Sequence, residues 1–514
     1  MEACQGQLSR WFHYSFLTFA AVFFYLQLFV LPATPIIGTD SDQSLYLHNA
    51  TRMLNGQMMY RDFFQFTPPG TELAYLTLFR LLGAHAWIPN LTLVALGVAL
   101  TWLYVYISRQ VLLGLTAYLP GCLFLILAFV PALDGSHHWF SMLAVTAATA
   151  LVIKTRNRTT LAGAGALCAL ASFFTQPRGL VAVVALALFL SWEYRRQPQS
   201  GRSLLASEAT LLGVFVTTTA ALNLYFVWAV GLRHFLWSVV TFGIKYYPAE
   251  SDLNSLKAYM AYVPMVRHLR HVPDPAWLFI HALLPLVYLL FFARCWHESR
   301  RTPDQPWDRL MLINLVGFLL FVGIAPAPVY WRLCVVSPPG LIVLVWFLRS
   351  PGRLHLIARK LLWLGAIIAA VNSVFVVQTR WRAYLSGPIG RGAFFEPSDF
   401  ERYRWLLEHT HPSEPFFDCT GQAYFFLGLR SPAKVSFLTS SDYTRPEQAL
   451  DLQESLEKYR VPLVVWTADL DPGAKGVRSG YHLAPLWNYL QTHYHALNTG
   501  ESHARILERN RSIP

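Results

Sequence analysis

The sequence predicts an α-helical polytopic membrane protein with about eleven transmembrane helices and a small C-terminal α/β domain outside the membrane. Hydrophobic residues make up 54% of the 514 residues and charged residues only 14%, with a mean hydropathy of +0.36. Soluble globular proteins carry about 25% charged residues, so a soluble enzyme and a disordered protein are both excluded. The apolar residues fall into long runs, whereas residues 379–514 lack such runs and have balanced charge.

The long apolar runs predict the membrane-spanning helices. A helix needs about 20 mostly apolar residues to cross the hydrocarbon core, because its backbone polar groups must be satisfied within the segment. The candidate spans are residues 11–31, 88–108, 112–131, 137–153, 160–176, 179–193, 207–230, 276–294, 309–327, 333–349 and 361–378. The first run is too long for a signal-peptide core, which indicates an uncleaved span. Residues 70–83 are apolar but short and contain Glu72 and Arg80, so we expect an interfacial or re-entrant helix there.

The distribution of charge predicts the orientation. The net charge of +12 lies before Arg380, because residues 380–514 contain 15 basic and 15 acidic residues. With a cytoplasmic N-terminus, the short inside loops carry 16 Lys and Arg residues and the longer outside loops carry ten. We therefore expect a multi-pass protein of the inner (plasma) membrane, with a transmembrane domain over residues 1–378 and a periplasmic domain over 379–514. Basic residues scattered between apolar runs are typical of membrane loops, so no nucleic-acid partner is expected.

No metal or other cofactor is expected. The six cysteines are scattered and none has CxxC spacing. His137 and His138 follow Asp134 at the exterior end of a predicted span. A divalent metal would need further ligands from the loop acids, and two adjacent histidines on one helix cannot easily bind the same ion. Contact with an acceptor or a phosphate is therefore favoured for this pair.

The first exterior loop, residues 32–87, is the candidate active site. Apolar residues recur at helical spacing between Asp42 and Asn55, and Gly56 follows them. This pattern predicts a short amphipathic helix on the membrane surface, with Asp40 and Asp42 at its N-terminal end. Asp42 could also be only a helix cap and Asp40 only a solvated acid. Against this, the loop holds four of the 14 acidic residues that precede residue 380.

The motifs of this loop resemble those of the C-type (GT-C) membrane glycosyltransferases, in the branch similar to protein O-mannosyltransferases and aminoarabinose transferases. The matching residues, in order, are Asp42, Tyr46, Met53-Leu54 with Gly56, and Pro68-Pro69. Two positions differ, since Gln43 stands where the family has Glu and Thr67 where many members have Lys. The first difference leaves open whether Asp40 or Asp42 is the working carboxylate.

The resemblance implies a glycosyltransferase that moves a hexose or pentose from a polyprenyl-phosphate carrier to an exterior hydroxyl. The acceptor would be a glycan, lipid or protein. Asp42 or Asp40 would act as general base on the acceptor hydroxyl, in a single displacement that inverts the anomeric carbon. The leaving phosphate is a stable anion, and cationic side chains would offset the charge that it gains as the bond to the sugar breaks. The expected partners are the lipid-linked sugar and membrane lipid.

Seven further residues are candidates for substrate binding. Arg178 is expected in a tight exterior turn between two spans, and Arg332 just before a span, although either could simply extend to the membrane interface. The full set is Tyr46, Arg61, Asp62, His137, His138, Arg178 and Arg332.

The C-terminal residues 379–514 predict a small α/β domain that shapes the acceptor entrance. Helices are expected from Ser398 and from Pro446, and buried strands from Pro415 and from Val461. No nucleophile elbow, phosphate loop or zinc signature is present in this sequence. Two alternatives to an enzyme remain. A transporter or flippase of lipid-linked glycans would place ionisable residues within the membrane and show symmetric halves. A non-catalytic scaffold for envelope assembly is consistent with Gln43.

Overall fold

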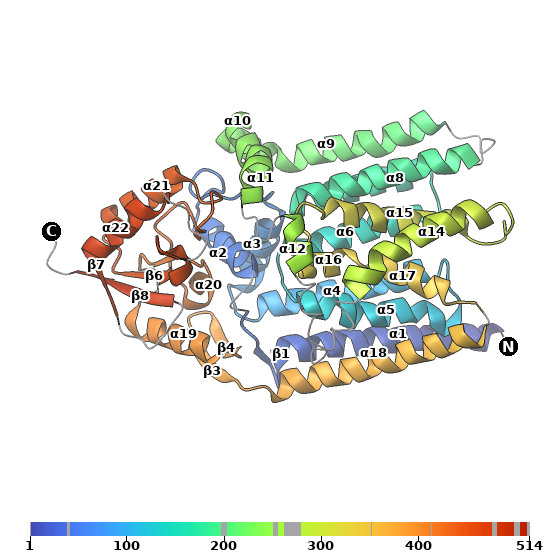
Figure 1. The fold of residues 1–514 in the computed structure, drawn as a ribbon, viewed down its shortest axis with the longest axis horizontal. Helices are drawn as coiled ribbons and strands as arrows, with labels where there is room; N and C mark the ends of the chain where they lie inside the picture. Colours follow the sequence, from blue (N-terminus) through green and yellow to red (C-terminus); the bar gives the residue numbers. More distant parts are fainter. Residues whose placement is uncertain are drawn as a thin grey trace. The chain divides into compact units, whose positions relative to one another are not determined.

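The computed structural model describes residues 2–38, 42–196, 203–249, 255–261, 279–350, 352–412, 414–474, 481–497 and 504–510. The chain is mostly helical and divides into two compact units (Figure 1). Unit 1 comprises Met1–Leu28, Leu91–Tyr225 and Asp252–Gln378. Unit 2 comprises Phe29–Asn90, Phe226–Ser251 and Thr379–Pro514. The first exterior loop and the C-terminal segment thus belong to the same unit.

Unit 1 is a helical bundle. Its helices are α1 (Glu2–Leu28), α4 (Ile88–Ser108), α5 (Leu119–Leu123), α6 (His137–Val152), α7 (Arg158–Phe174), α8 (Gln176–Arg196), α9 (Leu204–Val230), α12 (Leu256–Ala261), α14 (Leu284–Glu298), α15 (Trp307–Gly323), α16 (Tyr330–Val336), α17 (Pro338–Phe347) and α18 (Arg353–Thr379). Helix α6 packs against α7, α7 against α8, and α8 against α15. Small residues allow close packing, since a Cβ at Gly179 of α8 would collide with the backbone of Cys168 in α7.

Every range predicted as a span contains helix. Among the residues that the structure describes, six helical segments are long and apolar enough to cross a membrane, or seven if the bent pair α16 and α17 is one span. The six are Ile88–Ser108, Gly114–Ala132, α8, α9, Phe279–Glu298 and α18. The multi-pass character is thereby supported, while the number eleven remains a prediction.

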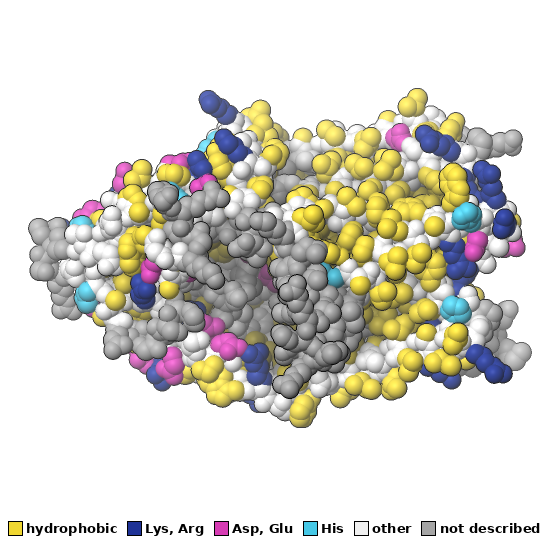
Figure 2. Space-filling view, viewed as in Figure 1, with side chains coloured by type: hydrophobic (Ala, Val, Ile, Leu, Met, Phe, Trp, Pro, Cys, Tyr) yellow, Lys and Arg dark blue, Asp and Glu magenta, His cyan; other side chains and the backbone are white. Residues whose placement is uncertain are grey.

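The outer surface of unit 1 suits a lipid environment. Helices α9 and α18 bury few of their apolar side chains, and Leu224, Trp228, Val371 and Phe375 are all exposed. Figure 2 shows hydrophobic side chains covering the helices of this unit. The same figure shows Lys and Arg side chains gathered at the end where the chain begins. Exposed apolar helices of this length are stable in hydrocarbon and unfavourable in water.

Unit 2 contains the first exterior loop, the short helices that follow α9, and the C-terminal segment. Its elements are β1 (Phe29–Val30), β2 (Thr34–Pro35), α2 (Asp42–Leu54), α3 (Gly70–Leu82), α10 (Leu232–Leu236), α11 (Phe242–Lys245), β3 (Ala383–Gly387), β4 (Gly390–Phe394), α19 (Pro397–His409), β5 (Phe417–Asp418), α20 (Ala423–Leu427), α21 (Pro446–Lys458), β6 (Leu463–Thr467), α22 (Ala484–His493), β7 (Tyr494–Ala496) and β8 (Ala504–Arg509). Helix α2 begins at Asp42 as predicted, and Gly56 has a φ of 88° just beyond its end. Helix α3 has 13 residues, too few to cross the hydrocarbon core.

A four-stranded sheet organises the C-terminal part of unit 2. The strand order is β5-β6-β8-β7, in which β5 and β6 are parallel and the other pairs antiparallel. Successive side chains of β6 enter two different cores, with Val464 and Trp466 in one and Leu463 and Val465 in the other. A strand buried on both faces explains the unbroken apolar run in the sequence. The predicted helices and strands are confirmed as α19, α21, β5 and β6.

Candidate functional site

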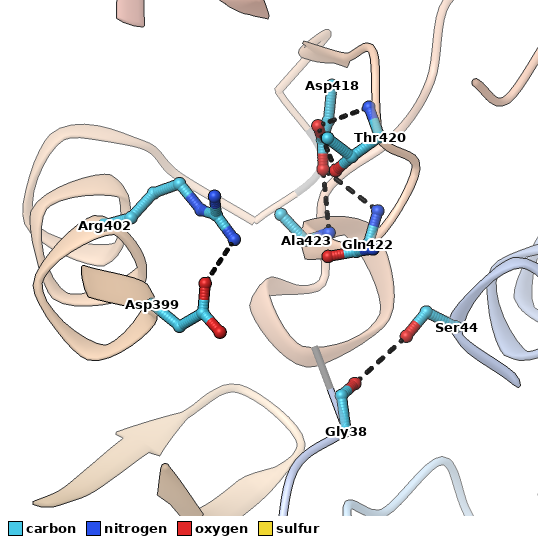
Figure 3. A network of polar contacts seen from close by, with 8 residues as sticks. All are labelled: Gly38, Ser44, Asp399, Arg402, Asp418, Thr420, Gln422 and Ala423. Carbon is cyan, nitrogen blue, oxygen red and sulfur yellow. Dashed lines mark hydrogen bonds and ion pairs between the residues drawn. The ribbon is translucent and has the colours of Figure 1, made fainter. Parts of the chain in front are cut away.

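Asp42 is the first residue of α2, where the helix dipole favours an ionised carboxylate. Its side chain is half-buried. Close to it, the hydroxyl of Ser44 donates a hydrogen bond to the carbonyl oxygen of Gly38 at 3.3 Å, which ties the start of the helix to the preceding segment (Figure 3). Asp40, the alternative base, lies outside the described residues. The position of Asp42 is compatible with a general base, and its role stays a prediction.

A buried polar layer joins α2 to α3 and to the loop between them. The hydroxyl of Tyr46 lies 3.4 Å from Oγ1 of Thr67, and the hydroxyl of Tyr60 donates to the carbonyl oxygen of Thr67 at 2.7 Å. Both tyrosines are almost completely buried. Tyr46, a predicted substrate contact, therefore has a partner within unit 2 and helps to fix the loop that leads into α3.

Glu72 is the buried acid of this layer. Its Oε1 accepts hydrogen bonds from Nε2 of Gln65 at 3.0 Å and from Nδ2 of Asn49 at 3.4 Å. Burial raises the pKa of Glu72 to about 7, although both hydrogen bonds act in the opposite direction. Oε2 of Glu72 has no hydrogen-bond partner among the described residues. Glu72 is not among the predicted site residues, and the signal for it in the sequence is a single acid in the first turn of a mostly apolar helix.

Arg52 is a second buried charged residue of unit 2 that was not among the predicted site residues. Its guanidinium donates to Oε1 of Gln57 at 2.7 Å and to the carbonyl oxygens of Ala433 at 3.0 Å and Asp62 at 3.2 Å. The same group lies over the ring of Phe63, 4.7 Å from its centroid. Burial lowers the pKa of Arg52 to about 10, so it is still charged at neutral pH. Arg52 therefore connects α2 to the C-terminal segment of the chain.

The predicted pair Arg61 and Asp62 lies at the surface of unit 2. The guanidinium of Arg61 pairs with the carboxylate of Asp62 at 2.8 Å, and the Arg61 side chain is 58% exposed. The carboxylate also accepts a hydrogen bond from the backbone N–H of Met58 at 2.7 Å. Asp62 thus stabilises its own turn, and Arg61 remains accessible to a ligand.

A turn built on Asp418 supports the position of α2. One carboxylate oxygen of Asp418 accepts hydrogen bonds from the backbone N–H and hydroxyl of Thr420, at 2.9 and 2.7 Å. The other accepts from the backbone N–H groups of Gln422 and Ala423, at 3.0 and 2.9 Å, where α20 begins (Figure 3). From α20, the ring of Tyr424 stacks on that of His48 in α2, with centroids 4.1 Å apart. One buried carboxylate therefore fixes the helix against which α2 packs.

In unit 1, the predicted residues from three separate segments form a single histidine–arginine cluster. It consists of His137, His138, Arg178 and Arg332. One guanidinium nitrogen of Arg178 donates to the carbonyl oxygen of His138 at 2.7 Å and to the hydroxyl of Ser141 at 2.9 Å. The ring of His138 contacts that of Trp331, 4.6 Å away, and the Arg332 guanidinium lies 4.9 Å from the same Trp331 ring.

Two local predictions for this cluster were wrong. Arg178 does not lie in a turn but in the first turn of α8, where it is 5% exposed. Arg332 does not precede a helix but belongs to the short helix α16, which is bent by 63° from α17. Pro177, the residue before Arg178, is accommodated at the start of α8 and does not separate Arg178 from the helix.

The cluster has the chemistry of an anion site. The guanidinium of Arg178 and the rings of His137 and His138 lie close together, and Arg332 lies over Trp331, whose ring contacts His138. Guanidinium and imidazole donors bind phosphate by charge-assisted hydrogen bonds. Nδ1 of His137 is 3.0 Å from Oγ1 of Thr175. Neither ring nitrogen of the buried His138 has a hydrogen-bond partner in the described part of the chain. The His138 ring therefore has hydrogen-bonding capacity that the described residues do not use.

Comparisons with known proteins identify the fold. No protein-family model matches the sequence, and no curated protein matches it. The structure is similar to that of ArnT from Cupriavidus metallidurans in the apo state, with a TM-score of 0.59, 12% identity, and coverage of 97% of this chain and 98% of ArnT. ArnT bound to undecaprenyl phosphate gives a TM-score of 0.56 at 12% identity, with 98% of both chains covered.

A third similar structure is the oligosaccharyltransferase AglB from Archaeoglobus fulgidus, in complex with an inhibitory peptide and a dolichol-phosphate. Its TM-score is 0.50 at 12% identity, and the match covers 98% of this chain and 75% of AglB. ArnT and AglB are C-type membrane glycosyltransferases. The chain therefore has the GT-C fold, as the motifs of the first exterior loop suggested.

Proposed function

We propose that this protein is a glycosyltransferase that takes a sugar from a polyprenyl-phosphate carrier and transfers it to a hydroxyl on the exterior side of the membrane. One observation carries the proposal. The fold extends over 98% of both this chain and an ArnT structure that holds undecaprenyl phosphate. The guanidinium groups of Arg178 and Arg332 give independent support, because the phosphate of such a carrier needs cationic partners.

The proposed base is Asp42, with Asp40 as the alternative. A hydroxyl is a poor nucleophile at neutral pH, and a carboxylate within hydrogen-bond distance removes its proton as the bond between sugar and phosphate breaks. The new bond forms between the acceptor oxygen and the anomeric carbon, and the electron pair of the broken bond stays on the phosphate. A single displacement of this kind inverts the anomeric configuration.

Arg178, Arg332, His137 and His138 are proposed to contact the carrier phosphate. Fixed positive charge stabilises the phosphate as its charge grows, so the leaving group needs no proton. For the same reason we propose a reaction that does not depend on a metal ion, and we expect EDTA to leave transfer unchanged.

Arg61, Asp62 and Tyr46 are proposed to border the acceptor.

The function can be tested by mass spectrometry of envelope glycans, lipids and glycoproteins from cells with and without the protein. We expect one envelope component to lose a hexose or pentose in the deletion strain, and the carrier-linked sugar to accumulate. A plasmid copy should restore both, whereas the Asp42→Asn variant should restore neither. Asp451→Asn is a matched control in unit 2 and should restore both. An unchanged envelope in the deletion strain would reject the proposal.

A further inference from the structure

A basic hollow lies at one end of unit 1, and none of the residues proposed above lines it. Its volume is about 470 Å³. The residues that line it come from α1, from the end of α4 and from the segment after α6. They are His13, Trp102, Tyr106, Arg109, Gln110 and Lys154. The hollow is therefore large enough for a polar headgroup and carries two permanent positive charges.

The hollow and the histidine–arginine cluster lie at opposite ends of α6. His137 begins this helix, and Lys154 follows its last residue, Val152, by two positions. A helix of 16 residues is about 24 Å long, which approaches the thickness of the hydrocarbon core. If the cluster faces the exterior leaflet, the hollow faces the cytoplasmic leaflet.

The two basic residues of the hollow have no acidic partner in the described part of the chain. Among the residues that the structure describes, neither Arg109 nor Lys154 forms an ion pair, and both are exposed. The neighbouring Arg156 differs, because it pairs with Glu193 at 3.4 Å and with Asp308 at 2.9 Å. Glu193 and Asp308 thus neutralise Arg156. The charges of Arg109 and Lys154 have no counter-charge among the described residues.

Aromatic side chains complete the hollow. The ammonium group of Lys154 lies 5.2 Å from the centre of the Tyr106 ring, which holds the flexible lysine over one wall. Trp102 lies one turn before Tyr106 on α4, and its side chain is 48% exposed. Tryptophan and tyrosine prefer the depth of lipid headgroups, where one edge of the ring is apolar and the other wet.

We propose that this hollow is a binding site for a phosphate ester, held by Arg109 and Lys154 against Tyr106 and Trp102. Two sources offer that chemistry at a membrane surface, an anionic phospholipid headgroup and a soluble phosphate. Basic hollows between membrane helices, bordered by interfacial aromatics, suit the first source. The site is separate from the proposed carrier site and would anchor or regulate the protein from the opposite leaflet.

The test is native mass spectrometry and lipid titration of the full-length protein in nanodiscs of phosphatidylcholine with increasing phosphatidylglycerol. The test variant is Arg109→Gln/Lys154→Gln. The matched control is Arg158→Gln/Arg301→Gln, which removes the same charge from two exposed residues outside the hollow, one at the start of α7 and one in the loop after α14. A third variant, Arg109→Lys/Lys154→Arg, keeps the charge and reports whether the site tolerates substitution.

We expect the test variant to bind phosphatidylglycerol about 25-fold more weakly than the wild type, since Arg109 and Lys154 each lose direct contact with the headgroup, at about a factor of five per residue. The control and the charge-conserving variant should retain most of the affinity. Competition by inorganic phosphate would assign the site to a soluble phosphate, and failure to compete would assign it to the lipid headgroup. Equal lipid binding by the wild type and a folded test variant would overturn the proposal.

Discussion

Nδ2 of Asn49 and Oε1 of Glu72 lie 3.4 Å apart in the interior of unit 2, where they join α2 to α3. Asp42 begins α2, so the orientation of this carboxylate depends on how α2 is held. Asn49, Arg52 and His48 all follow Asp42 on the same helix and fix it to three different parts of unit 2. The candidate base Asp42 therefore lies on the same helix as three residues that hold this helix in place.

Replacing Glu72 with Gln should remove a pH dependence of stability. The pKa of Glu72 is about 7 in the folded protein and close to 4.5 in an unfolded chain, so the neutral form is favoured by folding. The contribution of Glu72 to the free energy of unfolding is therefore fully present below pH 4.5. It is lost as the pH rises through 7, and the free energy of unfolding falls by about 3 kcal/mol in total.

The measurement is thermal unfolding of the detergent-solubilised protein between pH 5 and pH 8. We expect the stability of the wild type relative to Glu72→Gln to fall between pH 5 and pH 7 and to level off by pH 8, because Glu72 is then ionised in both the folded and the unfolded protein. His48, whose pKa burial lowers well below 6.5, titrates in both proteins and cancels in the difference. A constant difference would contradict a buried, titrating Glu72.

Replacing Arg52 with Ala should destabilise unit 2 by about 3 kcal/mol or more, because hydrogen bonds from a charged donor are lost and the carbonyl oxygens of Ala433 and Asp62 lose a partner. Arg52→Lys should recover only part of the loss, since an ammonium group lacks the planar fork. Arg61→Gln is the control, and its exposed ion pair should contribute less than about 1 kcal/mol. Equal melting temperatures for Arg52→Ala and Arg61→Gln would contradict the role of Arg52.

Replacing Gly421 with Ala should disturb the support of α2. Gly421 has a φ of 74°, and a Cβ there would collide with Leu45 of α2 and lie 2.7 Å from the carbonyl oxygen of Ser436. We expect a loss of about 2 kcal/mol or more, measured by thermal unfolding. Gly473→Ala should be nearly neutral, because nothing lies within 4 Å of that position. A neutral Gly421→Ala would show that α20 does not pack on α2 as described.

Replacing Arg178 or Arg332 with Gln should weaken the use of the lipid carrier. The loss of a charge-assisted hydrogen bond corresponds to about a tenfold to hundredfold increase in the carrier concentration needed for half-maximal transfer. Titration of the carrier in proteoliposomes measures this value, with Arg158→Gln as the control outside the cluster. An unchanged carrier dependence in both variants would remove these arginines from the proposed phosphate site.

The sequence predicted the features that depend on local pattern. Asp42 and Gly56 mark the ends of α2, and the apolar run before Thr467 marks a strand, because caps, glycines and hydrophobic period act over a few residues. Arg52 and Glu72 could not be recognised in the same way. The carbonyl oxygen that Arg52 binds lies 381 residues further along the chain, and the burial of Glu72 results from the packing of α2 on α3. Residues that act through distant partners have no signature in a single sequence.

The most direct test of the central claim is the transfer of sugar by the variants of Asp42 and Asp40, measured by mass spectrometry of the acceptor in cells that lack the native copy. If the first exterior loop supplies the base, Asp42→Asn, or the double variant with Asp40→Asn, should reduce product at least about a hundredfold while the amount of protein in the membrane stays normal. Full product formation by the double variant would contradict the assignment of this protein as a glycosyltransferase with its base in this loop.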